Sequence, residues 1–257
     1  MIFNSSKQQF PKEQKIIPTV FLLEFRECSS TLPIVMILCI DAVLTDEELE
    51  SIATALQTAP FIDGKTTAGW YAQQVKHNMQ LEGGTVAEDM RSLVMSALQR
   101  NALFQMAAYP KVIRPPLISR YTVGMSYGSH VDNALMGGSF PMRTDLSLTL
   151  FLNSPDAYDG GELVIEDTLG HHPFKLAAGA MVLYPATTLH RVAPVTRGTR
   201  LVAVTWVQSL VRDAGDRELL FELDTARQSL FQNHGKTPEF DRITKCHANL
   251  LRRWVEL

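Results

Sequence analysis

The sequence predicts a mainly β protein of the α+β class, in which a jelly roll (double-stranded β-helix) carries helices packed on it at both ends. Three observations predict this fold. From Val112 onward, short strand-like segments alternate with turns rich in Gly, Asn and Asp. Stretches with helical apolar spacing precede this region, and two more follow it. The 257 residues are enough for a single core of this kind with helical flanks.

One core domain with appendages is the organisation that we expect. We place a variable extension at residues 1–35, a helical support region at 36–110, the jelly-roll core at 111–211 and a C-terminal helical region at 212–257. Residues 1–35 differ in character from the segments that follow. The sequence does not separate a true extension from a start assigned too far upstream.

Composition and charge exclude several classes of protein. The chain is 46% hydrophobic and 20% charged, which is ordinary for a globular protein. A formal charge of −3 without a basic run argues against an obligatory nucleic-acid partner. No segment offers the ~20 apolar residues of a membrane helix, and no signal-peptide pattern is present. Cys28, Cys39 and Cys246 are scattered, so we expect a reducing, cytoplasmic location. The oligomeric state stays open, a homo-oligomer included.

Two capping-box signatures mark expected helix starts in the support region. Thr45 with Glu48 precedes an amphipathic stretch that ends near Ala59, and Thr85 with Glu88 opens a second one. In the second helix one apolar stripe is expected to pack on the outside of the barrel. The stripe consists of Val86, Met90, Leu93, Val94, Ala97 and Leu98. Near the C-terminus, helices are expected over Asp216–Gln232 and Pro238–Val255.

Two segments of the expected sheets need comment. In LSLTLFL, residues 146–152, leucines alternate with Ser147, Thr149 and Phe151, which predicts a strand with one apolar face. Residues 61–81 have weak periodicity and turn formers, which indicate a loop and a short strand. From this pattern alone the segment is an ordinary connection with exposed Lys76 and His77.

The segment SRYTVGMSYGSHVD, residues 119–132, ends in a His-x-Asp motif. In a strand, side chains two positions apart share a face, so His130 and Asp132 converge on one point. His190, before a second strand-like segment, is the best third ligand. Two imidazoles and one carboxylate form the facial triad of non-haem Fe(II) oxygenases, which leaves metal positions open for other ligands.

Arg200 lies in an otherwise apolar strand, TRLVAVTW. A buried charge must be paired, so an anionic ligand is one partner that would explain it. A planar guanidinium can bind a carboxylate through two donors, whereas lysine cannot. The alternative is an arginine at a strand end that reaches solvent, which is what we expect of Arg197.

The ordered set Tyr121, Tyr127, His130-x-Asp132, His190 and Arg200 resembles the Fe(II)- and 2-oxoglutarate-dependent dioxygenases related to prolyl 4-hydroxylases. The segments RTDLSLTLFLNSPDAYDGGELVIEDTLG and KLAAGAMVLYPATTLHRVAPVTRGTRLVAVTWVQSLVRD resemble more narrowly the bacterial PKHD-type hydroxylases. The resemblance extends from Met36 to the C-terminus. Residues 61–81 resemble the family's DG-x-x-TAG and VK-x-N stretches, which implies a lid on the substrate side as the alternative to an ordinary connection.

This resemblance implies Fe(II), 2-oxoglutarate and dioxygen as cofactor and co-substrates, with ascorbate as the reductant. It implies His130, Asp132 and His190 as metal ligands, and Arg200 with Tyr121 as co-substrate contacts. The reaction implied is hydroxylation of a small molecule or a peptidyl side chain, with release of succinate and carbon dioxide. Halogenating relatives lack the carboxylate ligand, and Asp132 is present here, which favours hydroxylation.

Two questions stay open at this point. Tyr127 is either a co-substrate contact or a packing aromatic, and Arg143 and Asp145 either orient the substrate or pair with each other. The rival to the enzyme hypothesis is a non-catalytic, cupin-like metal-binding or sensing module, in which Arg200 serves only the sheet.

Overall fold

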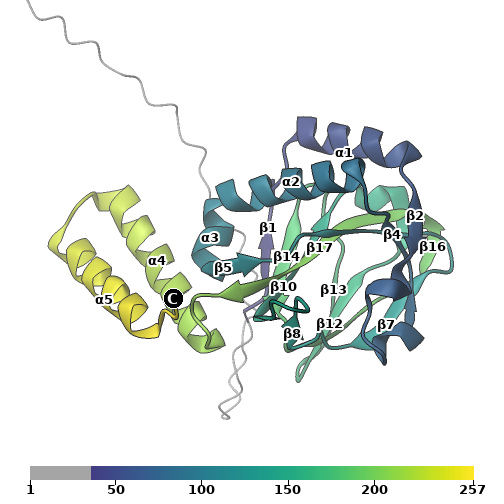
Figure 1. Cartoon of the computed structure of the whole chain (residues 1–257). Helices are drawn as coiled ribbons and strands as arrows, with labels where there is room; N and C mark the ends of the chain where they lie inside the picture. Colours follow the sequence, from purple (N-terminus) through teal and green to yellow (C-terminus); the bar gives the residue numbers. More distant parts are fainter. Residues whose placement is uncertain (1–35) are drawn as a thin grey trace, which may run out of the picture.

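Two antiparallel sheets form the body of the protein, and the computed structural model describes them within residues 36–257 (Figure 1). The extension predicted for residues 1–35 lies outside the described residues. The larger sheet consists of β1 (Leu38–Ile40), β2 (Phe61–Asp63), β4 (Met79–Leu81), β5 (Pro110–Ile113), β6 (Leu117–Tyr121), β10 (Leu146–Phe151), β14 (Met181–Pro185) and β17 (Arg200–Ser209). Its order is β1-β14-β10-β17-β6-β4-β2, and β5 pairs with β17.

The smaller sheet has five strands in the order β13-β12-β15-β7-β3. These are β3 (Lys76–His77), β7 (Ser126–His130), β12 (Leu163–Asp167), β13 (Gly170–Phe174) and β15 (Leu189–Val192). Two further antiparallel pairs are β8 (Leu135–Met136) with β9 (Met142–Arg143), and β11 (Tyr158–Gly160) with β16 (Val195–Gly198). This double-sheet arrangement confirms the predicted jelly roll with flanking helices.

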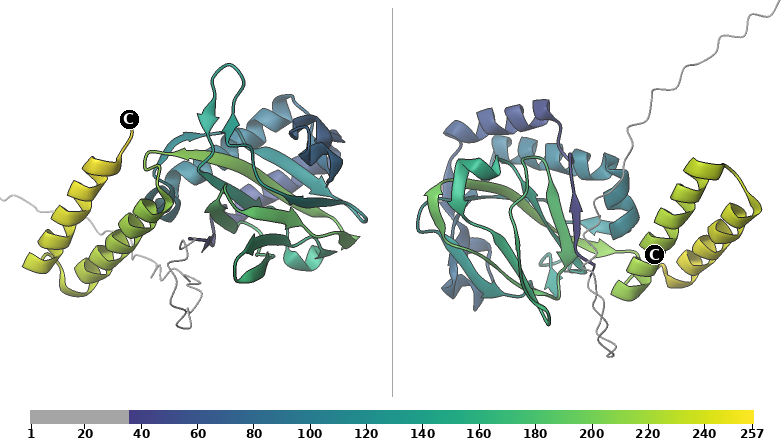
Figure 2. Two further views of the ribbon diagram at one scale, coloured as in Figure 1. Left: turned by 90° about the horizontal axis from the view of Figure 1, so that it is seen from below. Right: turned by 180° about the vertical axis from the view of Figure 1, so that it is seen from behind.

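Helices lie before and after the strands of the core. They are α1 (Asp46–Thr58), α2 (Thr85–Arg100), α3 (Ala102–Ala108), α4 (Ala214–His234) and α5 (Pro238–Trp254), with short 3-10 turns η1 (Gly64–Thr67), η2 (Ala72–Gln74) and η3 (Pro155–Ala157). Helices α1 and α2 run side by side over the larger sheet (Figure 1). The α4–α5 pair forms a hairpin that projects from the body of the molecule beside α3 (Figure 2).

The two predicted helix caps have different outcomes. At α1 the box is present: Glu48 N donates to Thr45 Oγ1 at 3.3 Å, and Thr45 N donates to Glu48 Oε2 at 2.9 Å. At α2 the prediction is wrong, because Thr85 is already inside the helix and Gly84 is the cap, with no side-chain hydrogen bond. Glu88 pairs instead with Arg91, one turn further along α2.

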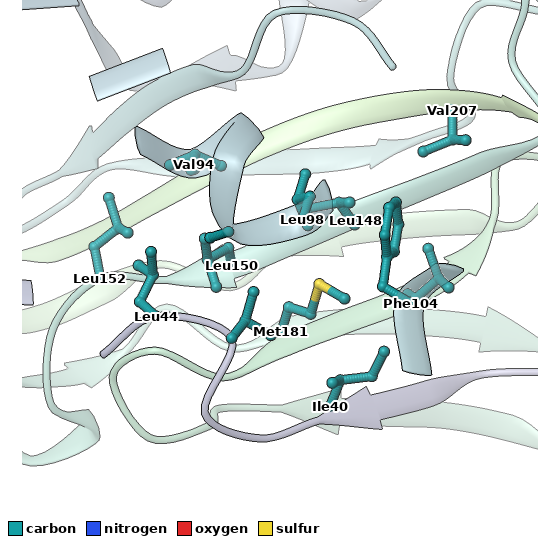
Figure 3. Packing of buried hydrophobic residues seen from close by; sticks show 14 of the residues in the cluster. Ile40, Leu44, Val94, Leu98, Phe104, Leu148, Leu150, Leu152, Met181 and Val207 are labelled. Carbon is teal, nitrogen blue, oxygen red and sulfur yellow. The ribbon is translucent and has the colours of Figure 1, made fainter. Parts of the chain in front are cut away.

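The main apolar core lies between the larger sheet and helices α1–α3. Leu148 and Leu150 of β10 pack with Val94 and Leu98 of α2 and with Phe104 of α3 (Figure 3). All of these side chains are at most 1% exposed. The burial of these apolar side chains is the main source of the stability of the fold.

Strand β10 shows the predicted alternation, but its second face is also buried. Ser147 and Thr149 are each 2% exposed, although their polarity is what a solvent-facing side would carry. The reason is that β10 lies in the middle of its sheet, between β14 and β17, and the face opposite the helices points into the interior of the jelly roll. The polar residues on this face are therefore not there to contact bulk solvent, and they must interact with other groups inside the jelly roll.

Two smaller findings concern the membrane and the thiols. Within residues 36–257, no helix has both the length and the apolar character needed to cross a bilayer. Cys39 and Cys246 are free thiols, and Cys28 lies outside the described residues.

Candidate functional site

The two histidines and the aspartate of the predicted triad come together in the structure. His130 ends β7, Asp132 follows two residues later, and His190 lies in β15. Because β7 and β15 are neighbours and His130 pairs directly with His190 in their ladder, the two imidazoles lie side by side. One ligand atom from each of the three residues lies within 4.8 Å of the others, and this is the one such cluster found among residues 36–257.

Both imidazoles are oriented by the backbone. His130 Nδ1 donates to the Gly128 carbonyl at 2.8 Å, and His190 Nδ1 donates to the Thr188 carbonyl at 3.1 Å. A proton held on Nδ1 leaves the lone pair of Nε2 free for a metal ion. Gly128 has a steric reason to lack a side chain, since a Cβ there would lie 2.7 Å from the Cβ of Val75.

The carboxylate of Asp132 is held from the opposite sheet. Ser147 Oγ of β10 donates to Asp132 Oδ2 at 2.6 Å, and the same carboxylate oxygen lies 3.8 Å from His190 Nε2. The polar face of β10 thus has a clear use, because it orients an acid that extends from the smaller sheet. A carboxylate fixed in this way has less conformational freedom to lose when it binds a cation.

Burial favours the neutral form of His130. Desolvation, and then the proximity of His190, lower the pKa of His130. An imidazole binds a metal only in its neutral form, so a lowered pKa prepares the site at neutral pH. Tyr127 stacks on the His130 ring with 3.7 Å between centroids, and Tyr184 meets His190 edge-on at 5.2 Å. These aromatic rings shield the imidazoles from water.

Arg200 is the largest fully buried side chain, with 1% exposure. It begins β17 and pairs across the ladder with Tyr121 of β6. Its guanidinium carbon lies 5.0 Å from the Tyr121 ring centroid and 5.7 Å from that of Phe151. Among the described residues no carboxylate forms an ion pair with it, and its Nε has no hydrogen-bond partner. Burial lowers the pKa of this guanidinium, and the nearby phenols oppose the shift only in part.

A buried cation without an acid beside it is costly, so a protein retains one when an anionic ligand completes the site. Arg200 and the triad line the same cavity, which has a volume of 470 Å³ and lies between the two sheets. Tyr121 and Tyr127 line it as well. The smaller sheet therefore contributes the two imidazoles and the adjoining carboxylate, and the larger sheet contributes the guanidinium.

Arg143 and Asp145 pair with each other and do not line this cavity. Arg143 Nε donates to Asp145 Oδ1 at 2.6 Å, and Arg143 Nη1 donates to Glu256 at 3.1 Å, near the C-terminus. Asp145 also accepts from Ser209 N at 2.8 Å. The pair thus joins the sheet to the C-terminal segment. Arg197 is exposed and pairs with Asp159.

The sequence interpretation missed a group of polar residues in segment 61–81. An ordinary connection was expected to expose both Lys76 and His77. Lys76 is only 5% exposed, so that expectation is wrong for Lys76, whereas His77 is exposed as expected. Lys76 pairs with Tyr127 in the β3–β7 ladder, and alternation turns Lys76 inward and His77 outward. Asn78 and Gln80 are each 3% exposed and line the cavity with Lys76. Their spacing at every second residue is the signal that could have revealed them.

Comparison with solved structures finds prolyl hydroxylases of low sequence identity. The chain is similar to a Pseudomonas putida prolyl-4-hydroxylase, with 18% identity, a TM-score of 0.46, and coverage of 67% of this chain and 92% of that chain. It is also similar to a Trichoplax adhaerens prolyl hydroxylase, solved in complex with a peptide fragment of hypoxia inducible factor. Here the identity is 15%, the TM-score 0.49, and the coverage 71% of this chain and 86% of that chain.

Comparison of sequences gives a closer relation. Residues 116–208 match the family model of the 2OG-Fe(II) oxygenase superfamily, and residues 214–256 match that of the PKHD-type hydroxylase C-terminal domain. A PKHD-type hydroxylase of Acaryochloris marina is 60% identical over 86% of this chain and 100% of its own length. One from Gloeothece citriformis is 55% identical with the same coverage. With this identity over the whole length of its relatives, the chain belongs to the PKHD-type hydroxylases, enzymes of the 2OG-Fe(II) oxygenase superfamily.

Proposed function

We propose that this enzyme hydroxylates a carbon atom of a small molecule or of a peptidyl side chain, and that 2-oxoglutarate and dioxygen are converted to succinate and carbon dioxide in the same turnover. The observation that carries the proposal is the cavity between the sheets. Two imidazoles, one carboxylate and a buried guanidinium without an acidic partner all line it.

In this proposal His130, Asp132 and His190 bind Fe(II). Two nitrogen donors and one oxygen donor suit this ion, and a triad on one side of it leaves positions for other ligands. The three residues fit the role because each imidazole has its Nδ1 occupied by a backbone carbonyl and Asp132 is fixed by Ser147. The bound iron would supply the chemistry that activates dioxygen.

Arg200 and Tyr121 bind the co-substrate in the same proposal. The guanidinium of Arg200 would take the distal carboxylate of 2-oxoglutarate through two parallel hydrogen bonds, one of them from the Nε, which has no partner within residues 36–257. Tyr121, 4% exposed and across the ladder from Arg200, would add its hydroxyl. Burial raises the pKa of Tyr121, so the phenol stays protonated and able to donate.

The remaining parts of the proposal concern supporting features. Ascorbate would return iron to the Fe(II) state after turnovers that do not hydroxylate substrate. We propose a cytoplasmic location on the basis of the scattered, unpaired thiols. We also propose that residues 36–110 support the core formed by residues 111–211, and that residues 212–257 form a separate helical unit.

The first test is spectroscopic. Anaerobic protein loaded with Fe(II) and 2-oxoglutarate should develop a weak visible charge-transfer band, and admission of oxygen should produce succinate slowly even without substrate. A binding or sensing module would bind the metal without either signal. Absence of both the band and succinate from fully metallated protein therefore contradicts the proposal.

The second test is metal removal. A chelator should abolish succinate formation, and Fe(II) should restore it. Zn(II), which has no redox chemistry, should occupy the site without restoring activity. Succinate formation that returns with Zn(II) alone would contradict the proposal, because the oxidation would then not depend on iron at this site.

The substrate itself requires an open search. Purified enzyme with Fe(II), 2-oxoglutarate and ascorbate should be incubated with metabolite and peptide extracts, and the products should be examined for a gain in mass of one oxygen atom. A matched reaction with Asp132→Ala separates enzymatic products from chemical oxidation.

A further inference from the structure

A second cation, Lys76, lines the cavity in addition to Arg200. Its strand β3 is the edge strand of the smaller sheet and pairs with β7, the strand that ends at His130. The Nζ atom lies 5.3 Å from the Tyr127 ring centroid and donates to Thr67 Oγ1 at 3.0 Å. Among the described residues no carboxylate forms an ion pair with it. Two of its three N–H groups are therefore available to a ligand.

Burial of this ammonium opposes its charge. Desolvation lowers the pKa of Lys76 to about 8, and the negative charges of Asp132 and Asp63 offset the shift only in part. A pKa of that value still leaves Lys76 mainly protonated at neutral pH. The Lys76 ammonium is thus 5% exposed and has one hydrogen bond, to Thr67, among the described residues. A buried charge with so few partners destabilises the folded protein unless a ligand pairs with it.

Neutral donors lie beside Lys76. Thr67 Oγ1, which accepts from Lys76, lies 2.7 Å from Gln80 Oε1 and can donate to it. Among the described residues, buried Gln80 Nε2 has no hydrogen-bond partner, and neither polar atom of Asn78 has one of good geometry, although Asn78 approaches the Tyr121 hydroxyl. Lys76, Asn78 and Gln80 occupy alternate positions along the chain and all line the cavity, Lys76 from β3 of the smaller sheet and Gln80 from β4 of the larger one. At this end of the cavity, donors of Lys76 and of both amides are left for a ligand.

The balance of charge in the cavity points to a further negative group. Asp132 is the one acidic residue that lines it, and the cations are Lys76, Arg114 and Arg200. If the proposed function holds, the charges of Fe(II), Asp132, doubly negative 2-oxoglutarate and Arg200 cancel. Arg114 is half-buried and accessible to water, whereas Lys76 is buried and, among the described residues, has no carboxylate within ion-pair distance.

We propose that Lys76, assisted by the Gln80 amide, binds a carboxylate of the primary substrate, so that the enzyme selects small carboxylic acids. Because Lys76 reaches the His130 side of the cavity through Tyr127, and Arg200 lies on the opposite sheet, the two cations serve different carboxylates. The proposal rests on the proposed function, and it adds the substrate class. The carbon to be hydroxylated then lies within a few bonds of that carboxylate.

The experiment compares Lys76→Met and Lys76→Arg with a control, Lys65→Met. Lys65 lies in the same segment but does not line the cavity. The probes are a panel of N-acetyl amino acids and their primary amides, which differ by one negative charge. Binding is measured by thermal shift, and stimulation of 2-oxoglutarate turnover is measured in parallel. We expect at least one free acid to bind the wild-type protein about 10-fold more tightly than its amide. That preference should be lost in Lys76→Met and retained in Lys76→Arg and Lys65→Met.

A second measurement separates substrate binding from co-substrate binding. The dissociation constant of 2-oxoglutarate, taken from the charge-transfer band without any probe, should change less than about 2-fold in Lys76→Met. A rise of 10-fold or more would assign Lys76 to the co-substrate and overturn the proposal. Free acids that bind no better than their amides, or an acid preference that survives in Lys76→Met, would also overturn it.

Failure of the proposed function would look different. In that case the wild-type protein would form no charge-transfer band, and the acid and amide probes would still test Lys76 by thermal shift. A stability measurement on metal-free protein adds a readout that is independent of activity. Lys76→Met should raise the melting temperature, by about 2–4 °C for each kcal/mol gained, because it removes a buried charge, whereas a structural role for the lysine would lower it.

Discussion

The larger sheet buries both of its faces, but the two faces are built from different chemistry. On the side of helices α1–α3, Leu148 and Leu150 of β10 and Ala203 of β17 belong to one apolar cluster. On the cavity side the same strands present Ser147 and Arg200. The exposed fraction of these residues is 2% or less on both sides. The exposed fraction therefore does not distinguish the two faces. What distinguishes them is whether the buried side chains carry polar atoms that need hydrogen-bond partners.

This difference assigns separate tasks to the two faces. Apolar packing on the helix side stabilises the fold without any ligand. On the cavity side, Arg200 has an Nε atom without a partner, and Gln80 has an Nε2 group in the same condition. Unpaired buried polar groups lower the stability of the ligand-free protein, and they stabilise the complex when a ligand pairs with them. Substitutions on the two faces should therefore separate stability from binding.

The largest effect is expected at Asp132. Asp132→Ala removes the carboxylate donor and should lower the rate of succinate formation by about 1,000-fold or more, with a matching loss of iron affinity, because two imidazoles alone bind the ion weakly. Iron content and succinate are measured on the same samples. The melting temperature of the metal-free protein should hardly change, and a mutant that keeps its activity would remove Asp132 from the ligand set.

Leu150→Ala tests the opposite face of the same strand, because Leu150 does not line the cavity. The side chain is 0% exposed and packs beneath the helices, so its truncation should lower the free energy of unfolding by about 2–5 kcal/mol. Denaturant titration of metal-free protein measures this loss. Below the melting temperature, the 2-oxoglutarate dissociation constant should stay within about 2-fold of the wild-type value. A large change in that constant would mean that the two faces are not independent.

Part of the triad could be predicted because the pattern that brings His130 and Asp132 together is local in the sequence. His130 and Asp132 are two residues apart, so the alternation of a strand is enough to bring them together, and the ordered set with His190 and Arg200 resembles a known family. The same alternation in β10 was correctly predicted, but it says only which residues share a face. It does not say what covers that face, and Ser147 was therefore not recognised as a partner of Asp132.

Two other features escaped prediction for physical reasons. Strand β3 has only two residues and lies between 3-10 turns and β4, so the one signal for the inward direction of Lys76 is the short alternation that it forms with Asn78 and Gln80, which is too brief to define a strand by itself. The missing cap of α2 depends on the backbone of Gly84, whose φ of 142° is a conformation that L side chains rarely adopt. A cap signature in the sequence cannot report the conformation of the residue that precedes it.

Arg200→Lys is expected to have an intermediate effect. One ammonium replaces a planar group with two parallel donors, so the 2-oxoglutarate requirement should rise by about 10- to 100-fold. The maximal rate of succinate formation should fall much less, because the groups around the metal are unchanged. Saturation curves for 2-oxoglutarate measure both quantities. An unchanged requirement would place the co-substrate anchor elsewhere in the cavity.

A change of pH should separate the two faces without any substitution. The pKa of His130 is lowered in the folded protein, so between its folded value and the ordinary value of about 6.5 the unfolded chain binds more protons. The contribution of His130 to the free energy of unfolding is fully present above about pH 6.5, and it is lost as the pH falls below this value. Denaturant titrations of metal-free protein between pH 7 and pH 5 should show the loss. His130→Gln should reduce the slope of stability against pH, whereas Leu150→Ala should leave it unchanged.

The smallest effect is expected at Ser147, which touches the site only through Asp132. Ser147→Ala removes the 2.6 Å hydrogen bond to Asp132 Oδ2, so the carboxylate gains freedom and iron affinity should fall by about 10-fold, the lower end of the range for residues that orient metal ligands. Competition with a chelator of known affinity measures this change. Ser147→Thr keeps the hydroxyl and should restore most of the affinity, whereas equal losses in both variants would indicate a packing defect. At saturating Fe(II), Ser147→Ala should turn over 2-oxoglutarate nearly as fast as the wild-type enzyme, because the three ligands themselves remain.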